Sequence, residues 1–518
     1  MIDETEVRML IADGRLGDAE RLVAAFLERD PDHAPALKLA AEIAFRRGDR
    51  EAGYSAAMKA VRRRPSDVEY GLDCAFNLVR SGRRDDALAI ADLVSGQKPR
   101  IADHLDVLGT IYTHCERPEA ALPHFEQACR QVPGSARFRF NLASVQRMLG
   151  ATGDAETNLD AAIALDGTQG SYFLARSQLR LQKPERNHIP ELRTALDRMG
   201  RSDGRISVGY ALAKELEDIT EHAESFRFLA AASAQERARI AYDPAQDIAM
   251  MRSLRSLDYA RPGDAAQAKP AGPGPIFVLG LPRSGTTLVE RIIASSGQAA
   301  SAGETNTLAA ELWRVAARSG RPADPTNAVV QAIESSGRHI GRAYLEILGA
   351  RFPGQRYIDK TPGNYLFAGL IGAHVPGARI ISVRRGAMDS CYAMYKTLFA
   401  DVYPFSYDLR ELADYFVEWT RLMGHWQATL GEALLTIAYE DLIRSPEATM
   451  RKIIDHCGLE WRDKCLKFHE LSSPVTSASA GQVNAPLNDR SVGLWQRYHS
   501  ELLPLAERLA KSGIDLEV

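Results

Sequence analysis

A glycine-bounded loop between two apolar stretches has the clearest chemical potential in the sequence. Ile276 to Leu279 is an unbroken apolar run, and Gly280 to Gly285 follows as a loop of mostly small residues with Arg283 inside it. From Thr286 onward, apolar residues recur at helical spacing. The backbone N–H groups of such a loop, together with the partial positive charge of a helix N-terminus, bind anions. The stretch therefore predicts a phosphate site between a buried strand and a helix.

The two glycines have the spacing of the nucleotide-binding pattern G-x-x-x-x-G-K-[ST], but Thr286 stands where the lysine belongs. No lysine spans β- and γ-phosphates, so the loop suits a nucleotide with a single 5′-phosphate group better than a triphosphate. Hydroxyl groups at Ser284, Thr286 and Thr287 add hydrogen-bond donors. The alternative is an ordinary glycine-containing turn, and the agreement of strand, loop and helix argues against it.

Two further polar residues follow positions where the chain turns back towards this loop. Lys360 comes directly after the short run Arg356-Tyr-Ile-Asp and precedes Thr-Pro, which directs it into the crevice at a strand end. Glu304 follows Ser301-Ala-Gly, after the first helix, where it could accept a proton from a hydroxyl group. In isolation Lys360 would be a surface lysine and Glu304 a capping or solvated glutamate. The neighbouring motifs favour functional roles.

A second cationic position lies at Arg384 and Arg385, where the β-branched run from Arg379 ends and a helix begins. Arginine at such a point suits a second phosphate group, because its planar fork binds two oxygens at once. The alternative is a pair of arginines that cap the edge of a sheet.

Strands alternate with helices around these residues. Apolar or β-branched runs occur at 276–279, 356–360, 379–384 and 434–441, and helical patterns lie between them, such as 328–348 and 408–430. This alternation predicts a three-layer α/β domain with a central parallel sheet. Ligands bind beyond the carboxyl ends of such strands, which is where the polar residues fall.

The N-terminal half has a repeat of 34 residues. Prolines recur at Pro31, Pro65, Pro99 and Pro133; glycines recur at Gly14, Gly48, Gly82 and Gly150; and small residues recur at Ala41, Ala75, Gly109 and Ala143. This is the length of the tetratricopeptide repeat (TPR), a pair of helices that stacks into a solenoid. The array predicts a concave surface that binds a protein or peptide partner. A structural or dimerisation role is the alternative.

The chain therefore reads as multidomain. Residues 1–166 form the all-α TPR solenoid, 167–258 a degenerate TPR-like helical cap, 259–275 a Pro/Gly/Ala-rich linker, and 276–518 the α/β domain.

Composition excludes several classes of function. A net charge of −3 gives no broad basic field for nucleic acid. The six cysteines are scattered, without metal-ligand spacing or a disulfide framework. The acidic N-terminus lacks the features of a signal peptide, and no apolar run is long enough to span a membrane. We expect a cytoplasmic protein with reduced thiols, no metal, no nucleic-acid partner and no membrane span.

Pro282-Arg-Ser-Gly-Thr-Thr287 after such a strand resembles the 5′-phosphosulfate loop of sulfotransferases that use 3′-phosphoadenosine 5′-phosphosulfate (PAPS). The likeness is greatest to the protein-tyrosine sulfotransferases and their bacterial relatives with TPR repeats, and it extends from about residue 275 to about residue 510. It implies a P-loop-like sulfotransferase domain that converts PAPS to 3′-phosphoadenosine 5′-phosphate (PAP) without a metal. The acceptor would be a hydroxyl group, with a protein tyrosine recruited by the repeats as one candidate.

The same resemblance implies roles for individual residues. Glu304 is the implied catalytic base, and Lys360 and Arg283 the implied cations that stabilise the transferring and leaving groups. Arg385 is the implied partner of the 3′-phosphate. The remaining implied cofactor contacts are Pro282, Arg283, Ser284, Gly285, Thr286, Thr287, Ser491 and Gly493, and residues 474–483 are an expected lid.

One position departs from the family pattern of an arginine followed eight residues later by a serine. Eight residues after Arg385 stands Ala393, and eight after Arg384 stands Tyr392. The missing hydroxyl group puts the affinity for the 3′-phosphate and the activity in question.

Three alternatives to a protein-tyrosine sulfotransferase stay open. The acceptor could be a saccharide, a lipid or a small molecule. The domain could be a P-loop nucleotide kinase or NTPase, against which Thr286 argues. The chain could also be a TPR scaffold with an inactive nucleotide-binding domain, which Ala393 keeps open. The sequence leaves the acceptor, the TPR partner and the oligomeric state undetermined.

Overall fold

The computed structural model describes residues 3–47, 49–64, 66–80, 83–200, 202–259, 273–317, 324–471 and 486–516. The chain divides into two compact units, Met1–Gly167 and Thr168–Val518.

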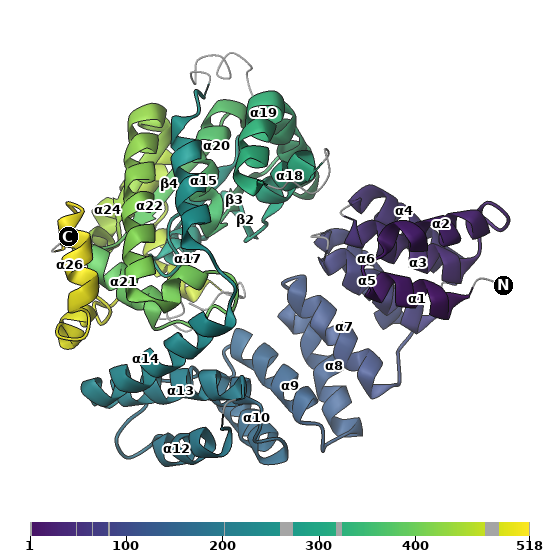
Figure 1. The fold of residues 1–518 in the computed structure, drawn as a ribbon, viewed down its shortest axis with the longest axis horizontal. Coiled ribbons are helices and arrows are strands. Elements are labelled where there is room, and N and C mark those ends of the chain that lie inside the picture. The colour runs from purple at the N-terminus through teal and green to yellow at the C-terminus, as the bar shows by residue number, and fades with distance from the viewer. Residues whose placement is uncertain are drawn as a thin grey trace. The chain divides into compact units, whose positions relative to one another are not determined.

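The first unit is a stack of helix pairs with the predicted period (Figure 1). The first helices of successive pairs begin at residues 34, 68, 102 and 136, and the second helices at 50, 84, 118 and 152, so both series advance by 34 residues. The TPR fold of this half is therefore confirmed. Its helices are α1 (Glu4–Ala12), α2 (Leu16–Leu27), α3 (Ala34–Arg46), α4 (Arg50–Arg63), α5 (Val68–Arg80), α6 (Arg84–Gly96), α7 (Ala102–His114), α8 (Pro118–Gln131), α9 (Ala136–Met148) and α10 (Thr152–Leu165).

Small residues of the repeat lie where helices cross closely. A Cβ atom on Gly109 of α7 would come within 2.8 Å of the Phe125 ring on α8, so a larger residue would push the two helices apart. Glu116, which replaces a glycine of the repeat, takes the same positive φ that Gly14 and Gly150 adopt in the equivalent turns. Pro65, Gly48 and Gly82 lie outside the described residues.

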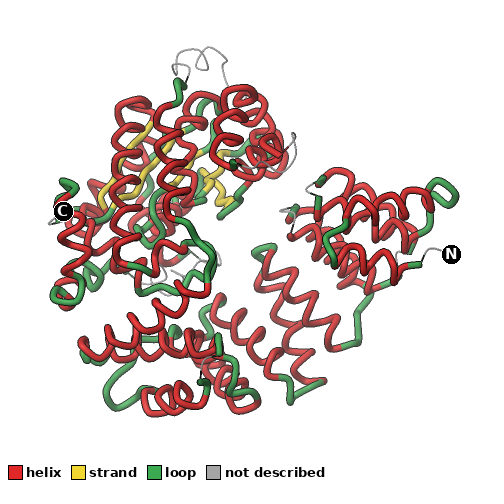
Figure 2. Tube along the Cα trace, viewed as in Figure 1, coloured by secondary structure: helices red, strands yellow, loops and turns green. Residues whose placement is uncertain are grey.

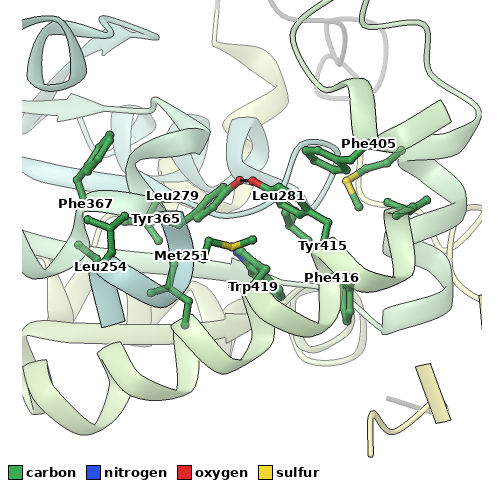
Figure 3. Packing of buried hydrophobic residues seen from close by; sticks show 14 of the residues in the cluster. Met251, Leu254, Leu279, Leu281, Tyr365, Phe367, Phe405, Tyr415, Phe416 and Trp419 are labelled. Carbon is green, nitrogen blue, oxygen red and sulfur yellow. Dashed lines mark hydrogen bonds between the residues drawn. The ribbon is translucent and has the colours of Figure 1, made fainter. Parts of the chain in front are cut away.

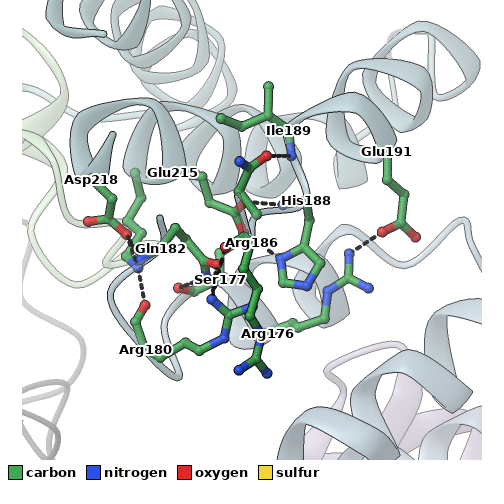
Figure 4. A network of polar contacts seen from close by, with 12 residues as sticks. Arg176, Ser177, Arg180, Gln182, Arg186, His188, Ile189, Glu191, Glu215 and Asp218 are labelled. Atoms are coloured by element: carbon green, nitrogen blue, oxygen red, sulfur yellow. Dashed lines mark hydrogen bonds and ion pairs between the residues drawn. The ribbon is translucent and has the colours of Figure 1, made fainter. Parts of the chain in front are cut away.

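The second unit opens with the helices α11 (Gly170–Ser177), α12 (Ile189–Arg198), α13 (Gly204–Asp218), α14 (His222–Arg239) and α15 (Pro244–Ser256). The polar break between α11 and α12 is fastened to α13 by the buried carboxylate of Glu215 (Figure 4). Ser177 Oγ donates to Glu215 Oε1 over 2.6 Å, and His188 Nδ1 lies 2.9 Å from the same oxygen. The break is thus an ordered part of the helical segment.

A second carboxylate on α13 fastens this helical segment to the α/β part of the same unit. Glu217 accepts hydrogen bonds from Tyr392 (2.6 Å) and Tyr498 (3.0 Å) and pairs with Lys396 (2.6 Å). Tyr392 belongs to helix α21 (Ala387–Tyr395), and Tyr498 ends the 3₁₀-helix η6 (Leu494–Tyr498). One side chain therefore holds two elements that adjoin the predicted nucleotide clamp.

The α/β part is built on a five-stranded, all-parallel sheet of order β2-β3-β1-β4-β5, drawn in yellow in Figure 2. The strands are β1 (Ile276–Leu279), β2 (Ala299–Gly303), β3 (Arg356–Asp359), β4 (Arg379–Arg384) and β5 (Leu434–Ala438). The predicted parallel sheet is confirmed. Strand β2, at one of the two edges of the sheet, and helix α15 were not among the individually predicted elements.

Alternate residues of β1 point into two different cores. Phe277 and Leu279 join the core beneath α15, α19 (Pro325–Arg351) and α22 (Leu409–Leu430). Ile276 and Val278 join the core beneath α17 (Thr286–Ser295) and α24 (Pro446–His456). Burial on both faces explains the unbroken apolar run. The other elements are α18 (Thr307–Ala316), η2 (Pro362–Phe367), α20 (Ala368–His374), η3 (Pro404–Tyr407), η4 (Gly431–Ala433), α23 (Tyr439–Arg444), η5 (Asp463–Glu470) and α26 (Leu503–Lys511).

Most of the predicted linker, residues 260–272, and the whole expected lid, residues 474–483, lie outside the described residues. At the start of the linker, Tyr259 is buried, with its ring 5.2 Å from that of Trp426 in an edge-on contact. All six cysteines are buried free thiols, as expected. The predicted domain bounds remain predictions.

Candidate active site

The predicted phosphate loop joins the end of β1 to the start of α17, as the sequence indicated. Gly280 has φ +153°, and a Cβ atom on it would come within 2.4 Å of the Val383 carbonyl oxygen. Gly285 has φ +106°, and a Cβ atom there would come within 2.8 Å of the Tyr439 ring. Both positions need glycine because the loop lies directly against β4 and the residue that follows β5. The loop is thereby held at the carboxyl ends of three strands.

Two side chains of this loop are poised for an anion. Arg283 has φ +67°, a conformation that non-glycine residues rarely adopt and that often occurs at functional sites. Burial and the nearby Arg385 lower the pKa of Arg283 to about 10, so an anion beside its guanidinium would relieve both effects. The buried Oγ of Ser284 has no hydrogen-bond partner among the described residues. This free donor, together with the N-terminus of α17, fits a phosphate group.

Arg385 connects the phosphate loop to the C-terminal segment. Its Nη1 donates to the Arg283 carbonyl oxygen over 3.5 Å, and its Nη2 donates to the Ser491 carbonyl oxygen. Its guanidinium lies 5.2 Å from the centre of the Tyr439 ring, and its buried Nε has no partner among the described residues. The structure therefore brings Arg283, Arg385 and Ser491 together, although they lie far apart in the sequence.

Asp389 links Gly493 to Arg385. Asp389 Oδ2 accepts the Gly493 N–H over 2.6 Å, and its Oδ1 lies 4.0 Å from Arg385 Nη2. A cavity of about 360 Å³ is lined by Arg490, Val492, Gly493, Leu494, Gln496 and Arg497. Since the Gly493 N–H is engaged by Asp389, the predicted nucleotide contact of this residue stays a prediction. The sequence analysis did not single out Asp389.

Lys360 and Glu304 form an ion pair. Lys360 Nζ lies 2.5 Å from Glu304 Oε1 and 3.9 Å from Oε2 of Glu290 on α17. Lys360 is buried, whereas 47% of the Glu304 side chain is exposed. Ser301 Oγ donates to Glu290 over 2.5 Å, so β2 and α17 hold this second carboxylate in place. The sequence analysis missed Glu290, which sits among the apolar residues of a buried helix.

Asp359 holds the two loops that carry this ion pair. Its fully buried carboxylate accepts from Thr305 Oγ1 (3.0 Å), Thr361 Oγ1 (2.7 Å) and Tyr344 OH (3.1 Å). Burial raises the pKa of this carboxyl group, and the hydrogen bonds oppose that rise. Thr305 follows Glu304, and Thr361 follows Lys360, so Asp359 sets the relative position of both. Its place at the end of a strand, before the lysine, was the available signal.

Each of the five strands is thus followed by a residue or loop of the candidate site, at the carboxyl-terminal end of the sheet. The phosphate loop follows β1, Glu304 follows β2, Lys360 follows β3 and Arg385 follows β4. After β5, Glu440 accepts the Gly386 N–H over 3.0 Å and so holds the start of α21. Among the described residues, no group of three His, Cys, Asp or Glu side chains is placed to hold a metal ion. In the same part of the chain, no helix is both long and apolar enough to cross a membrane.

Residues 275–463 match the model of the sulfotransferase family. This stretch contains the phosphate loop, Glu304, Lys360 and Arg385. It is a sulfotransferase-family domain. The predicted family resemblance is therefore confirmed for the C-terminal part of the chain, and the helical residues before 275 lie outside the match.

Three relatives illustrate the similarity of the sulfotransferase domain and its surroundings. An uncharacterised protein of Aquifex aeolicus (strain VF5) is 30% identical over 329 residues, which make up 60% of this chain and 42% of that protein. Protein-tyrosine sulfotransferase 2 of Gallus gallus is 23% identical, over 46% of this chain and 69% of its own. Protein-tyrosine sulfotransferase 1 of Danio rerio is 24% identical, over 45% and 71%. The chain spans less than half the length of the Aquifex protein.

Solved structures resemble each part of the chain. The sulfotransferase domain from the curacin biosynthetic pathway has 17% identity and a TM-score of 0.30, covering 46% of this chain and 98% of that one. YrrB, described as a TPR protein with an unusual peptide-binding site, has 15% identity and a TM-score of 0.28, covering 40% and 96%. The fold assignment here rests on the repeat period and the sheet topology of this chain.

Proposed function

We propose that this protein transfers a sulfuryl group from PAPS to a hydroxyl group of an acceptor, with a protein tyrosine as the leading candidate. The observation that carries the proposal is the Glu304–Lys360 ion pair beside a phosphate loop that lacks the P-loop lysine. A carboxylate and a buried ammonium at this edge of the sheet supply a base and a cation, the two groups that transfer to a hydroxyl needs.

The nucleotide would be held by residues that the structure brings to one place. Residues 282–287 offer loop N–H groups, the hydroxyl groups of Ser284, Thr286 and Thr287, and the N-terminus of α17 for the 5′ end. Arg385, with its unpartnered Nε, would bind the 3′-phosphate, and Ser491 and Gly493 would complete the clamp. When bound, PAPS supplies an activated sulfuryl group on a phosphate leaving group.

The chain's own side chains would then handle protons and charge. Glu304 takes the proton of the acceptor hydroxyl as its oxygen forms the new bond to sulfur. Lys360 and Arg283 hold the negative charge that builds up as the bond between sulfur and the phosphate oxygen breaks. The ion pair with Lys360 holds the Glu304 side chain beside the proposed site of transfer. Asp359 accepts hydrogen bonds from Thr305 and Thr361 and so sets the spacing of the two loops that carry Glu304 and Lys360.

A protein acceptor is supported by two observations. The relatives in Gallus gallus and Danio rerio are named protein-tyrosine sulfotransferases, at 23% and 24% identity. The TPR unit is of a type that presents a concave surface to peptides and proteins, so it would recruit the acceptor protein. Reduced, buried thiols agree with the proposed cytoplasmic location.

The experiment that tests this function is calorimetric titration of the full chain with PAP, with ADP and ATP as controls. Tight binding of PAP alone supports the donor, and transfer of ³⁵S-labelled sulfate from PAPS to tyrosine peptides supports the activity. A preference for ATP would reject the proposal and favour a P-loop kinase, and no binding of any nucleotide would also reject it. Binding of PAP without transfer to any acceptor would favour a scaffold with an inactive nucleotide-binding domain. Binding of PAP with transfer only to saccharides or lipids would keep the donor and reject the tyrosine acceptor.

A further inference from the structure

A cavity of about 520 Å³ is lined in part by residues of the two loops that carry Glu304 and Lys360. Asn306 and Thr361 are among its lining residues. Asn306 lies two residues after Glu304, and Thr361 directly follows Lys360. The Asn306 N–H donates to Thr361 Oγ1 over 3.3 Å, and Thr361 is held by Asp359. The loops that carry the base and the cation therefore also form part of the cavity wall.

The cavity lies on the opposite side of the phosphate loop from the nucleotide clamp. Its loops follow β2 and β3, whereas the clamp follows β4, and β1 lies between them in the sheet. A nucleotide held by Arg385 would leave this cavity open. Its volume is that of a typical small-molecule pocket, which suits the reacting part of an acceptor.

The cavity wall is mainly apolar and partly aromatic. Met250 and Phe367 contribute, and Trp313 of α18, which is 42% exposed, adds an indole surface. Helix α15 supplies Met250 and Asp247 from outside the sulfotransferase-family match. An indole surface and apolar walls favour an acceptor whose hydroxyl group is carried on an aromatic ring.

Helix α15 is rigidly placed for this role (Figure 3). Met251 and Leu254 of α15 point into the same buried cluster as Tyr365 and Trp419. Within this cluster, Tyr365 OH is hydrogen-bonded to Tyr415 OH on α22. Helix α15 is thus anchored in the core of the second unit by the residues next to those that line the cavity.

The charge of the cavity is negative. Asp247 and Asp324 line it, and its described lining residues include no lysine, arginine or histidine. Asp247 accepts from Tyr242 OH over 2.7 Å, and Asp324 caps the start of α19 by accepting the Asn327 N–H over 3.1 Å. Each hydrogen bond leaves a carboxylate with further acceptor capacity. Burial raises the pKa of Asp247, and a cation beside it would offset that effect.

We propose that this cavity is the acceptor site and that it selects a phenolic hydroxyl accompanied by positive charge. The inference rests on the proposed sulfotransferase function and adds the acceptor class: for a protein, a tyrosine with lysine or arginine neighbours. The phenol ring lies against Trp313, its hydroxyl is directed towards Glu304, and the positive group faces Asp247 and Asp324. Helix α15 therefore helps to set specificity from outside the family domain.

The test uses two phenols that carry opposite charges on similar side chains, tyramine and 3-(4-hydroxyphenyl)propionate. The full chain is first saturated with PAP, and binding of each phenol is followed by calorimetry. Sulfate transfer from PAPS to each is then measured. We expect tyramine to bind and react at least about tenfold better, since Asp247 and Asp324 attract its ammonium group and repel the carboxylate of the propionate.

Variants assign that preference to the cavity. Asp247→Asn and Asp324→Asn should each reduce the preference for tyramine several-fold, and Asn at 324 can still cap α19. Trp313→Ala should raise KM for both phenols and leave PAP binding unchanged. Asp197→Asn, at an exposed position on α12, is the matched control and should change nothing.

The outcomes separate this inference from the proposed function. If PAP binds but the two phenols bind equally, or the propionate binds better, the acceptor inference is wrong while the donor assignment stands. The same holds if the three cavity variants behave like Asp197→Asn, or if neither phenol binds to the PAP complex. If PAP itself does not bind, the proposed function fails and the acceptor inference falls with it.

Discussion

Lys360 and Glu304, which lie 56 residues apart in the chain, meet through a 2.5 Å contact between Nζ and Oε1. One partner is buried and the other half exposed. The exposed partner can therefore reach an incoming hydroxyl group while the buried partner stays beside the phosphate loop. The first two predictions therefore replace these two residues one at a time.

Replacing Glu304 by Gln removes the proposed base with little change in shape. We expect the rate of sulfate transfer to fall by about 10² to 10⁴, the usual contribution of a general base, while PAP binding stays close to wild type. Glu507→Gln, at an exposed glutamate on α26, is the matched control. A Glu304→Gln enzyme with wild-type turnover would exclude Glu304 as the base.

Replacing Lys360 by Met removes the buried cation and keeps most of its apolar volume. Because the charge on the leaving group then lacks a partner, we expect turnover to fall by about 10² to 10³. The variant should also unfold at a lower temperature, since Glu290 loses its nearby positive charge. Lys511→Met on the surface of α26 controls for the substitution. Loss of stability without loss of turnover per folded molecule would make Lys360 purely structural.

Arg385 and Arg384 are neighbours with different surroundings, and this difference separates their roles. Arg384 is exposed, whereas Arg385 contacts both the phosphate loop and Ser491. Arg385→Ala should weaken PAP binding about 10- to 100-fold, as expected for loss of a hydrogen bond to a charged group. The affinity of the same variant for AMP, which has no 3′-phosphate, should fall much less. The Arg384→Ala variant should bind both nucleotides with wild-type affinity. If instead PAP binding is weakened in Arg384→Ala and unchanged in Arg385→Ala, Arg384 is the residue that binds the 3′-phosphate.

Ala393 occupies the position where the family pattern has a serine. Ala393→Ser restores the hydroxyl group on α21, and we expect PAP affinity to rise by up to about tenfold, with AMP affinity unchanged. Calorimetry of both nucleotides on the variant gives the answer. If PAP binds no more tightly, residue 393 does not face the 3′-phosphate in this protein.

Asp359→Asn tests the residue that sets the spacing of the two loops. The amide has one acceptor oxygen for three hydroxyl donors, so we expect a loss of about 1 to 3 kcal/mol in unfolding free energy at pH 7. Turnover should fall while PAP affinity is largely kept, because the phosphate loop is not attached to Asp359. Chemical unfolding and single-turnover assays measure the two effects separately.

The pH dependence of that variant has a definite sign. The pKa of Asp359 is raised in the folded state, so its burial lowers stability above that pKa, and this loss is relieved as pH falls towards the value in the unfolded chain. An asparagine has no such relief. The stability gap between wild type and Asp359→Asn should therefore widen as the pH is lowered from 7 towards the ordinary pKa of an aspartate, about 4. A constant gap would indicate that the pKa of Asp359 is not raised in the folded protein.

Local pattern was enough to predict much of this architecture. Strands β1 and β4 are apolar or β-branched runs buried on both faces, and the repeat series fixed the starts of the TPR helices. By contrast, Ala299–Gly303 consists of small residues with low strand propensity, and it forms an edge strand only because it pairs with β3. Sequence spacing does not reveal such pairing.

Some residues of the candidate site could likewise be predicted from the local sequence, and others could not. Glu304, Lys360 and Arg385 could be named because each follows a recognisable segment at a strand end. Glu290, Asp359 and Asp389 act through side chains that reach them from distant parts of the sequence, and helix α15 meets the catalytic loops only through tertiary packing. The resemblance to known sulfotransferases begins at about residue 275, after α15, so it offered no guide to the part of the cavity wall that α15 contributes.

The attachment of Glu217 to Tyr392, Lys396 and Tyr498 has a practical consequence for dissecting this chain. A fragment beginning at residue 275 would contain every residue of the family match, yet it would expose the apolar surface under α13 to α15 and leave Lys396 without its carboxylate. Such a fragment should be poorly soluble. The shortest autonomous fragment is therefore expected to begin near residue 168, so that the start of the family match and the start of the cooperatively folding unit lie about a hundred residues apart.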